Sequence, residues 1–165
     1  TAQGEPEEQV AGIWGQPDEL CGAMQNVGFD TTDYTELPGS GYFCSDSKRV
    51  TEMSEATNYK WNDLQYSVSG ESATRANEIR FGLWVAALGQ AERDRLRLMS
   101  LASDLVEAGF NRDFPEEVER MVRENESGTW SDEDLRITVK QEPFREESEL
   151  DGETYELVIQ PASGQ

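Results

Sequence analysis

The sequence predicts an α+β fold, with a mostly antiparallel sheet of about five strands packed against about three helices in the order α-β-β-β-α-α-β-β. Two observations predict it. Apolar residues alternate with polar ones in several segments, as in half-buried strands, and recur at helical spacing in others. Consecutive strands are followed by consecutive helices and then by strands again. This order favours a fold in which helices and strands are segregated. With 165 residues, the chain has the size of one ordinary domain.

The first helix is expected over residues 17–27. Pro17 suits the first position of a helix, the two acids after it favour the helix N-terminus, and Gly28 suits the C-terminal cap. A Leu-Pro-Gly-Ser-Gly run then predicts a turn. A short strand is expected next, over residues 42–44.

Two clearer strands follow, each with apolar residues at every second position. A hairpin loop around Gly70 joins them. The residues expected to face the core are Leu64, Tyr66 and Val68 in the first strand, and Ile79, Phe81, Leu83 and Val85 in the second.

The strongest helical pattern covers residues 90–108, and Gly109 is expected to end it. Arg93, Arg95 and Arg97 fan around this helix among acidic neighbours, which indicates local ion pairs. A third helix is expected to start near Pro115, with Asp113 as its N-cap.

The last two strands are predicted from alternate apolar residues, Leu135, Ile137 and Val139 in one and Tyr155, Leu157 and Ile159 in the other. Residues 141–152 are expected to form a long acidic loop between them. The domain organisation is therefore a flexible acidic N-terminal arm over residues 1–12, a single α+β domain over 13–160, and a frayed tail over 161–165. A helix end with the pattern small-Gly-Phe-Asx occurs twice, at residues 27–30 and 108–111. It indicates either a duplicated unit or two separate glycine caps.

The composition excludes several classes of function. The chain contains no histidine and two cysteines, so neither a Ser-His-Asp triad nor a His-bearing or four-Cys zinc site is available. Its net charge of −20 disfavours nucleic acids and anionic membrane surfaces. No apolar run is long enough to span a bilayer, and no phosphate-binding glycine motif occurs. We therefore expect no cofactor, no metal and no membrane insertion.

The acidic charge is concentrated at the two ends of the chain. Residues 1–47 carry a net charge of −9, residues 48–100 carry +1, and residues 101–165 carry −12. One hypothesis is an acidic face that binds a basic protein partner. The alternative is that the charge only keeps a monomer soluble, or adapts it to high salt.

Cys21 and Cys44 are predicted to form a disulfide between the first helix and the first strand. Closing a loop of this size stabilises a fold by roughly 3 kcal/mol. The alternative is two buried thiols. A disulfide indicates an exported protein, periplasmic or secreted, and a chain that begins with Thr1 rather than Met fits the removal of a targeting segment, or trimming.

The candidate binding surface is Trp84 with Arg80. Both alternate with the apolar residues of their strand, so they are expected on the sheet face turned away from the helices. Exposed Trp and Arg side chains are frequent in binding surfaces. The alternative is that a terminal arm or the acidic loop covers this face.

These observations predict an exported, non-enzymatic domain that acts by binding a protein or another ligand. In its order of elements alone, the chain is similar to small acidic secretion chaperones, which are cytosolic; this resemblance implies a cytosolic chaperone or inhibitor of a basic protein as the alternative. A third possibility is a hydrolase that uses only carboxylates.

Overall fold

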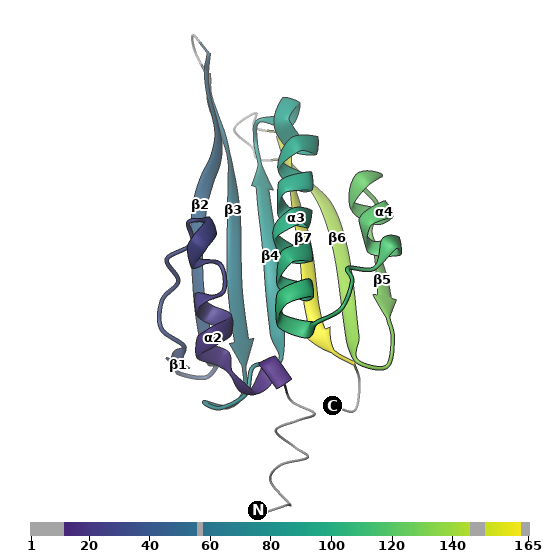
Figure 1. The fold of residues 1–165 in the computed structure, drawn as a ribbon. Helices are drawn as coiled ribbons and strands as arrows, with labels where there is room; N and C mark the ends of the chain where they lie inside the picture. Colours follow the sequence, from purple (N-terminus) through teal and green to yellow (C-terminus); the bar gives the residue numbers. More distant parts are fainter. Residues whose placement is uncertain (1–11, 56–57, 146–150, 163–165) are drawn as a thin grey trace, which may run out of the picture.

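The computed structural model describes residues 12–55, 58–145 and 151–162 (Figure 1). The helical elements are η1 (Gly12–Gly15), α2 (Pro17–Gly22), η2 (Gln25–Val27), η3 (Leu88–Gln90), α3 (Ala91–Phe110) and α4 (Glu116–Arg123). The strands are β1 (Thr35–Leu37), β2 (Gly41–Glu55), β3 (Asn58–Gly70), β4 (Glu78–Val85), β5 (Gly128–Ser131), β6 (Leu135–Arg145) and β7 (Asp151–Pro161).

The strands form one antiparallel sheet in the order β1-β2-β3-β4-β7-β6-β5. The α+β class is therefore confirmed. Each half of the sheet is a meander that follows a helix, α2 before β2-β3-β4 and α4 before β5-β6-β7. The two halves meet where β4 pairs with β7, and α3 lies over this junction (Figure 1).

The sheet has seven strands among the described residues, more than the predicted five. β1 and β5 were not expected because they are short and polar, and every residue of β1 is exposed. β2 spans 15 residues where three were expected. The sequence of β2 shows little apolar alternation. Its hydrogen bonds to β3 define the strand instead, and they extend from the pair Tyr42↔Gly70 to the pair Glu55↔Asn58.

The helix boundaries also differ from the prediction. The first helix ends at Gly22 and a separate 3₁₀ turn follows, after which Gly28 adopts the predicted left-handed cap at φ 99°. At the end of α3 the left-handed residue is Asn111, at φ 53°, and not Gly109. The two Gly-Phe-Asx helix ends are therefore different caps. The N-cap position of α4 is Pro115 rather than Asp113.

The predicted acidic loop over residues 141–152 is mostly strand. β6 continues to Arg145 and β7 begins at Asp151, because the two strands pair as far as Arg145↔Asp151. Residues 146–150 lie outside the described residues, as does the predicted N-terminal arm apart from Gly12. Of the predicted tail, Pro161 ends β7 and residues 163–165 lie outside the described residues.

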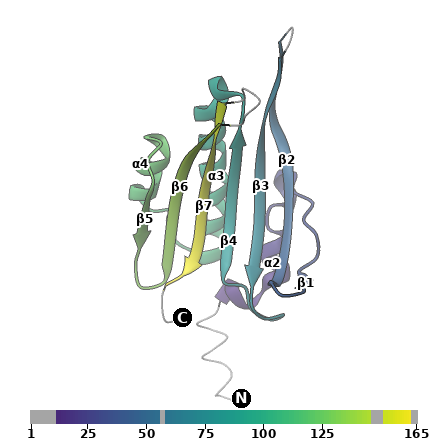
Figure 2. The ribbon, with the colours of Figure 1, turned by 180° about the vertical axis from the view of Figure 1, so that it is seen from behind.

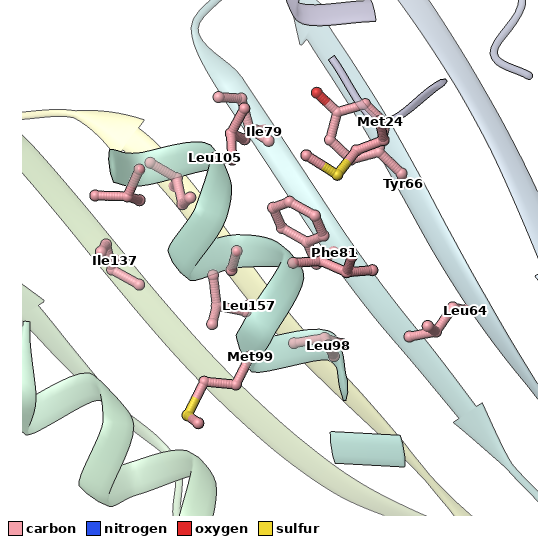
Figure 3. Close-up of a cluster of buried hydrophobic side chains, with 14 of the residues drawn as sticks. Met24, Leu64, Tyr66, Ile79, Phe81, Leu98, Met99, Leu105, Ile137 and Leu157 are labelled. Carbon is pink, nitrogen blue, oxygen red and sulfur yellow. The ribbon is translucent and has the colours of Figure 1, made fainter. Parts of the chain in front are cut away.

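The core lies between the helices and one face of the sheet, where α3 crosses β4 and β7 (Figure 3). Every residue predicted to face the core from β3, β4, β6 and β7 is buried. Burying one such large apolar side chain contributes about 1.5–3 kcal/mol. Among the largest buried side chains are Tyr66, Phe81, Leu98, Leu157 and Tyr155.

The predicted disulfide is present. Cys21 of α2 is bonded to Cys44 of β2, with 6.1 Å between their Cα atoms, and both residues are buried. The bond attaches the short helix α2 to β2, next to the residues that pair with β1. No helix in the described part of the chain is both long and apolar enough to cross a membrane.

Candidate functional site

The sheet has one face turned away from all the helices, which we call the open face (Figure 2). Alternation along the strands decides which side chains lie on it. On β4, Ile79, Phe81, Leu83 and Val85 are buried under the helices, so Glu78, Arg80, Gly82 and Trp84 lie on the open face. The two residues of the predicted binding surface, Trp84 and Arg80, are therefore on this face.

Three aromatic side chains form a continuous row on the open face, which we call the aromatic row. Tyr59 and Trp61 alternate outward along β3, and their ring centroids are 5.4 Å apart. Trp61 in turn lies 5.3 Å from Trp84 of the neighbouring strand. Tyr59 is 45% exposed, and both tryptophans are partly buried. Trp84 therefore contributes to a row that spans two strands, with Trp61 at its centre.

Arg49 of β2 covers one side of this row. Its guanidinium carbon lies 4.9 Å from the Trp61 ring centroid, in the range of a cation–π contact. The same guanidinium donates hydrogen bonds to the Tyr59 hydroxyl at 3.3 Å and to the Asp63 carboxylate at 3.2 Å. These hydrogen bonds, that to Tyr59 first, raise the pKa of Arg49. The row is thus held by side chains from three adjacent strands.

A shallow hollow of about 530 Å³ lies on the same face, further along the same strands. We call it the serine hollow, because small hydroxyl side chains form its floor: Ser45 pairs with Ser67 across β2 and β3, and Ser47 and Ser69 flank them. The complete lining is Phe43, Ser45, Asp46, Ser47, Gln65, Ser67, Ser69, Glu78 and Arg80.

The polar side chains of the serine hollow differ in how far they are already paired. Arg80 forms ion pairs with Glu78 at 3.2 Å and with Glu156 at 3.3 Å. By contrast, within the described residues the four serine hydroxyls and the Gln65 amide form no hydrogen bond with another protein group. These groups are available to a ligand that replaces the water on them.

Gly82 lies between Arg80 and Trp84 on β4 and is buried. A Cβ atom at this position would meet the Gln65 side chain at 3.4 Å, an ordinary contact. The Gln65 side chain, which lines the serine hollow, therefore lies over Gly82. The site is therefore one elongated surface over β2, β3 and β4.

The open face carries little of the protein's negative charge. Counted by strand alternation over the described residues, it has four bases and five acids, a net charge of −1, against −14 for all the described residues together. These residues are Arg49, Arg80, Arg136 and Lys140, and Glu52, Asp63, Glu78, Glu142 and Glu156. The acidic surplus therefore lies on other surfaces.

Two groups of buried polar residues lie on the helix side of the sheet, and the sequence interpretation missed both. Asp94 accepts hydrogen bonds from Thr51 and Asn62, at 2.6 and 2.7 Å. Arg95, expected in a local ion pair, is buried instead; it donates to the Val122 carbonyl at 3.3 Å and lies 3.7 Å from Glu153. These contacts join elements of the fold, so we assign both groups a structural role.

Trp61 and Tyr59 were also missed, although one signal was present. Their odd numbers place them out of phase with the inward residues Leu64 and Tyr66 of the same strand. The polar Asn62, buried at an inward position, hid the alternation. Within the described residues there is no group of three or more acidic or cysteine side chains placed to hold a metal ion.

Comparisons with family models, with curated proteins and with solved structures found no match to this chain.

Proposed function

We propose that this protein is an exported, non-enzymatic binding domain that holds its partner against the open face of the sheet. The observation that carries the proposal is the aromatic row of Tyr59, Trp61 and Trp84, with Arg49 over it. Trp, Tyr and Arg are the side chains that dominate the energetics of binding surfaces. Trp and Tyr bury large areas, and their few rotatable bonds lose little entropy on binding.

The low net charge of the open face supports a partner of low net charge. A strongly basic partner would be attracted to the acidic surfaces elsewhere. It would gain little at the open face, where Asp63 and Glu156 are already paired with arginines. The alternative proposal, a chaperone or inhibitor of a basic protein, would use those acidic surfaces. The two proposals therefore assign binding to different parts of the molecule.

The disulfide between Cys21 and Cys44 supports export. Disulfides persist in oxidising compartments and are rare in the cytosol of most organisms. We therefore propose a periplasmic or secreted location.

Immobilised protein, incubated with soluble extract of the source cells and of their medium, tests the proposal. The comparison uses the wild type, Trp61→Ala, Trp84→Ala and Leu88→Ala, at about 0.1 M and about 1 M salt. Leu88 is a matched control, since it is 49% exposed and lies on η3, away from the open face. Salt screens attraction between exposed charges, because the Debye length falls from about 10 Å to about 3 Å over this range.

The proposal expects a partner retained at high salt by the wild type and Leu88→Ala, and lost from both tryptophan variants. Binding that disappears at high salt and is unchanged in the tryptophan variants would instead support the acidic-surface alternative. The non-enzymatic part is tested by a hydrolase screen with and without Mg²⁺, Ca²⁺ and Zn²⁺. Turnover that a single carboxylate substitution abolishes would favour the carboxylate-only hydrolase.

A further inference from the structure

We infer that the open face binds a neutral polysaccharide chain, with sugar rings packed on the aromatic row and sugar hydroxyls bonded in the serine hollow. This inference rests on the proposed function, because it names the ligand of the same site. Three properties of the site carry it: the hydrogen-bonding groups that it offers, its charge and its length.

The first property is the pairing of aromatic rings with unengaged hydroxyl and amide groups. A pyranose ring has a face of C–H groups and a rim of hydroxyls that both donate and accept hydrogen bonds. The C–H face fits the electron-rich face of an aromatic ring such as that of Tyr59, which is 45% exposed. The four serine hydroxyls and the Gln65 amide both donate and accept as well. They therefore complement a ligand of many hydroxyls.

The second property is that both arginines over the site are already paired with carboxylates. Arg49 is held by Asp63, and Arg80 by Glu78 and Glu156. Binding a phosphate, sulfate or carboxylate group here would require one of these pairs to break and would leave a carboxylate beside the ligand. Paired charges still offer hydrogen bonds to neutral hydroxyls. An anionic ligand is therefore disfavoured, and the net charge of −1 on the open face offers little attraction to a strongly cationic one. We expect an uncharged ligand.

The third property is the length of the site. Tyr59 and Ser69 mark its two ends on β3, and ten residues of strand span about 33 Å. Such a span is much longer than one sugar ring. The aromatic and polar parts lie on the same three strands, so one extended chain contacts both.

Affinity electrophoresis in native gels tests the inference, because a protein with a net charge of −20 migrates readily while a neutral polysaccharide in the gel does not move. The gels contain laminarin, galactomannan, hydroxyethylcellulose or pullulan as neutral chains, and alginate as an anionic one. We expect at least one neutral chain to retard the wild type relative to a gel without polysaccharide.

Two kinds of variant locate the binding. Trp61→Ala and Trp84→Ala are expected to weaken binding at least tenfold, while Leu88→Ala binds as the wild type does. Gly82→Val adds methyl groups beside the Gln65 side chain, between hollow and row, without removing a side-chain contact. Gly82 has no left-handed backbone angle, and valine favours strands, so this variant is expected to fold and to bind at least tenfold more weakly.

The inference is overturned if no neutral chain retards the wild type, if alginate alone does so, or if the folded Gly82→Val and tryptophan variants bind undiminished. Its failure is distinguishable from failure of the proposed function. A protein captured at high salt and lost from the tryptophan variants, with no retardation by any polysaccharide, leaves the open face as the binding surface and overturns only the ligand class.

Discussion

The side-chain amide nitrogen of Asn62 lies 2.7 Å from the carboxylate oxygen Oδ2 of Asp94, and neither side chain is exposed to solvent. Asn62 belongs to β3 and Asp94 to the first turn of α3. The amide oxygen of Asn62 also accepts hydrogen bonds from the main-chain N–H groups of Ala86 and Ala87, at 3.0 and 2.9 Å. One side chain thus holds the connection through which β4 leads into α3.

Replacing Asn62 with alanine is expected to destabilise the protein by about 3 kcal/mol or more. The Ala87 N–H would lose its hydrogen-bond partner, and the buried Asp94 carboxylate would lose one of its donors. The free-energy cost is large for each, because both groups are removed from water. Urea unfolding followed by circular dichroism measures the change. Gln65→Ala, on the open side of the same strand, is the control and is expected to change stability by less than about 0.5 kcal/mol. An Asn62→Ala protein as stable as this control would contradict the structural role.

Removing the disulfide by the double substitution Cys21→Ala and Cys44→Ala is expected to lower the free energy of unfolding by roughly 3 kcal/mol. The bond closes a loop across a sequence separation of 23 residues and anchors the short helix α2, so its loss gives the unfolded chain more freedom. The reduced wild type should be destabilised to a similar extent. Thiol titration of the denatured, unreduced protein should find no free thiol, and two titratable thiols would contradict the bond.

Two buried tyrosines are expected to respond oppositely to replacement by phenylalanine. The Tyr66 hydroxyl donates to the Leu20 carbonyl at 2.5 Å, so Tyr66→Phe leaves a buried acceptor unpaired and should cost about 1–3 kcal/mol. The Tyr155 hydroxyl is buried and has no hydrogen-bond partner among the described residues, so Tyr155→Phe should be neutral or stabilising. Thermal unfolding compares the two. A larger loss in Tyr155→Phe would show that its hydroxyl has a partner.

Burial raises the pKa of Tyr66, so this phenol binds its proton more tightly in the folded than in the unfolded protein. Its contribution to stability is therefore fully present at neutral pH and decreases once the pH exceeds about 10, the ordinary pKa of tyrosine. We expect the stability of the wild type to fall more steeply above pH 10 than that of Tyr66→Phe. Identical alkaline profiles would contradict this assignment.

The acid stability of the protein is expected to depend in part on Asp132. The Arg112 guanidinium and then the main-chain N–H groups of Leu135 and Asp134 lower the pKa of this carboxyl to about 2, from 3.8. Because the pKa of Asp132 is lower in the folded than in the unfolded protein, its ionised carboxylate stabilises the fold at any pH above the unfolded pKa. This stabilisation is lost as the pH falls from about 4 to about 2.

The variant Asp132→Asn keeps an acceptor for the two N–H groups and removes the charge. We therefore expect it to be less stable than the wild type at pH 6 and to converge with it near pH 2. Unfolding in urea at a series of pH values measures the difference. A gap of constant size from pH 6 to pH 2 would show that the charge is not responsible.

The sequence by itself determined the α+β class, the core-facing residues of four strands, the helix α3 and the Cys21–Cys44 bond. These features depend on local information, because a strand or helix with one buried face repeats its apolar residues at the period of its own geometry. The alternation of Ile79, Phe81, Leu83 and Val85 therefore predicted their burial correctly. It also placed Trp84 and Arg80 on the opposite face.

Features that depend on pairing between segments distant in the sequence are seen only in the tertiary structure. β1, β5 and most of β2 are defined by hydrogen bonds to neighbouring strands, and their polar sequences carry no apolar period. The contact of Trp61 with Trp84 joins residues on adjacent strands, so the register between β3 and β4 creates the aromatic row. Asp94 and Arg95 look like surface charges of a helix, and they are buried because Asn62 and Glu153 lie opposite them. The local sequence pattern around Asp94 and Arg95 does not indicate these distant partners.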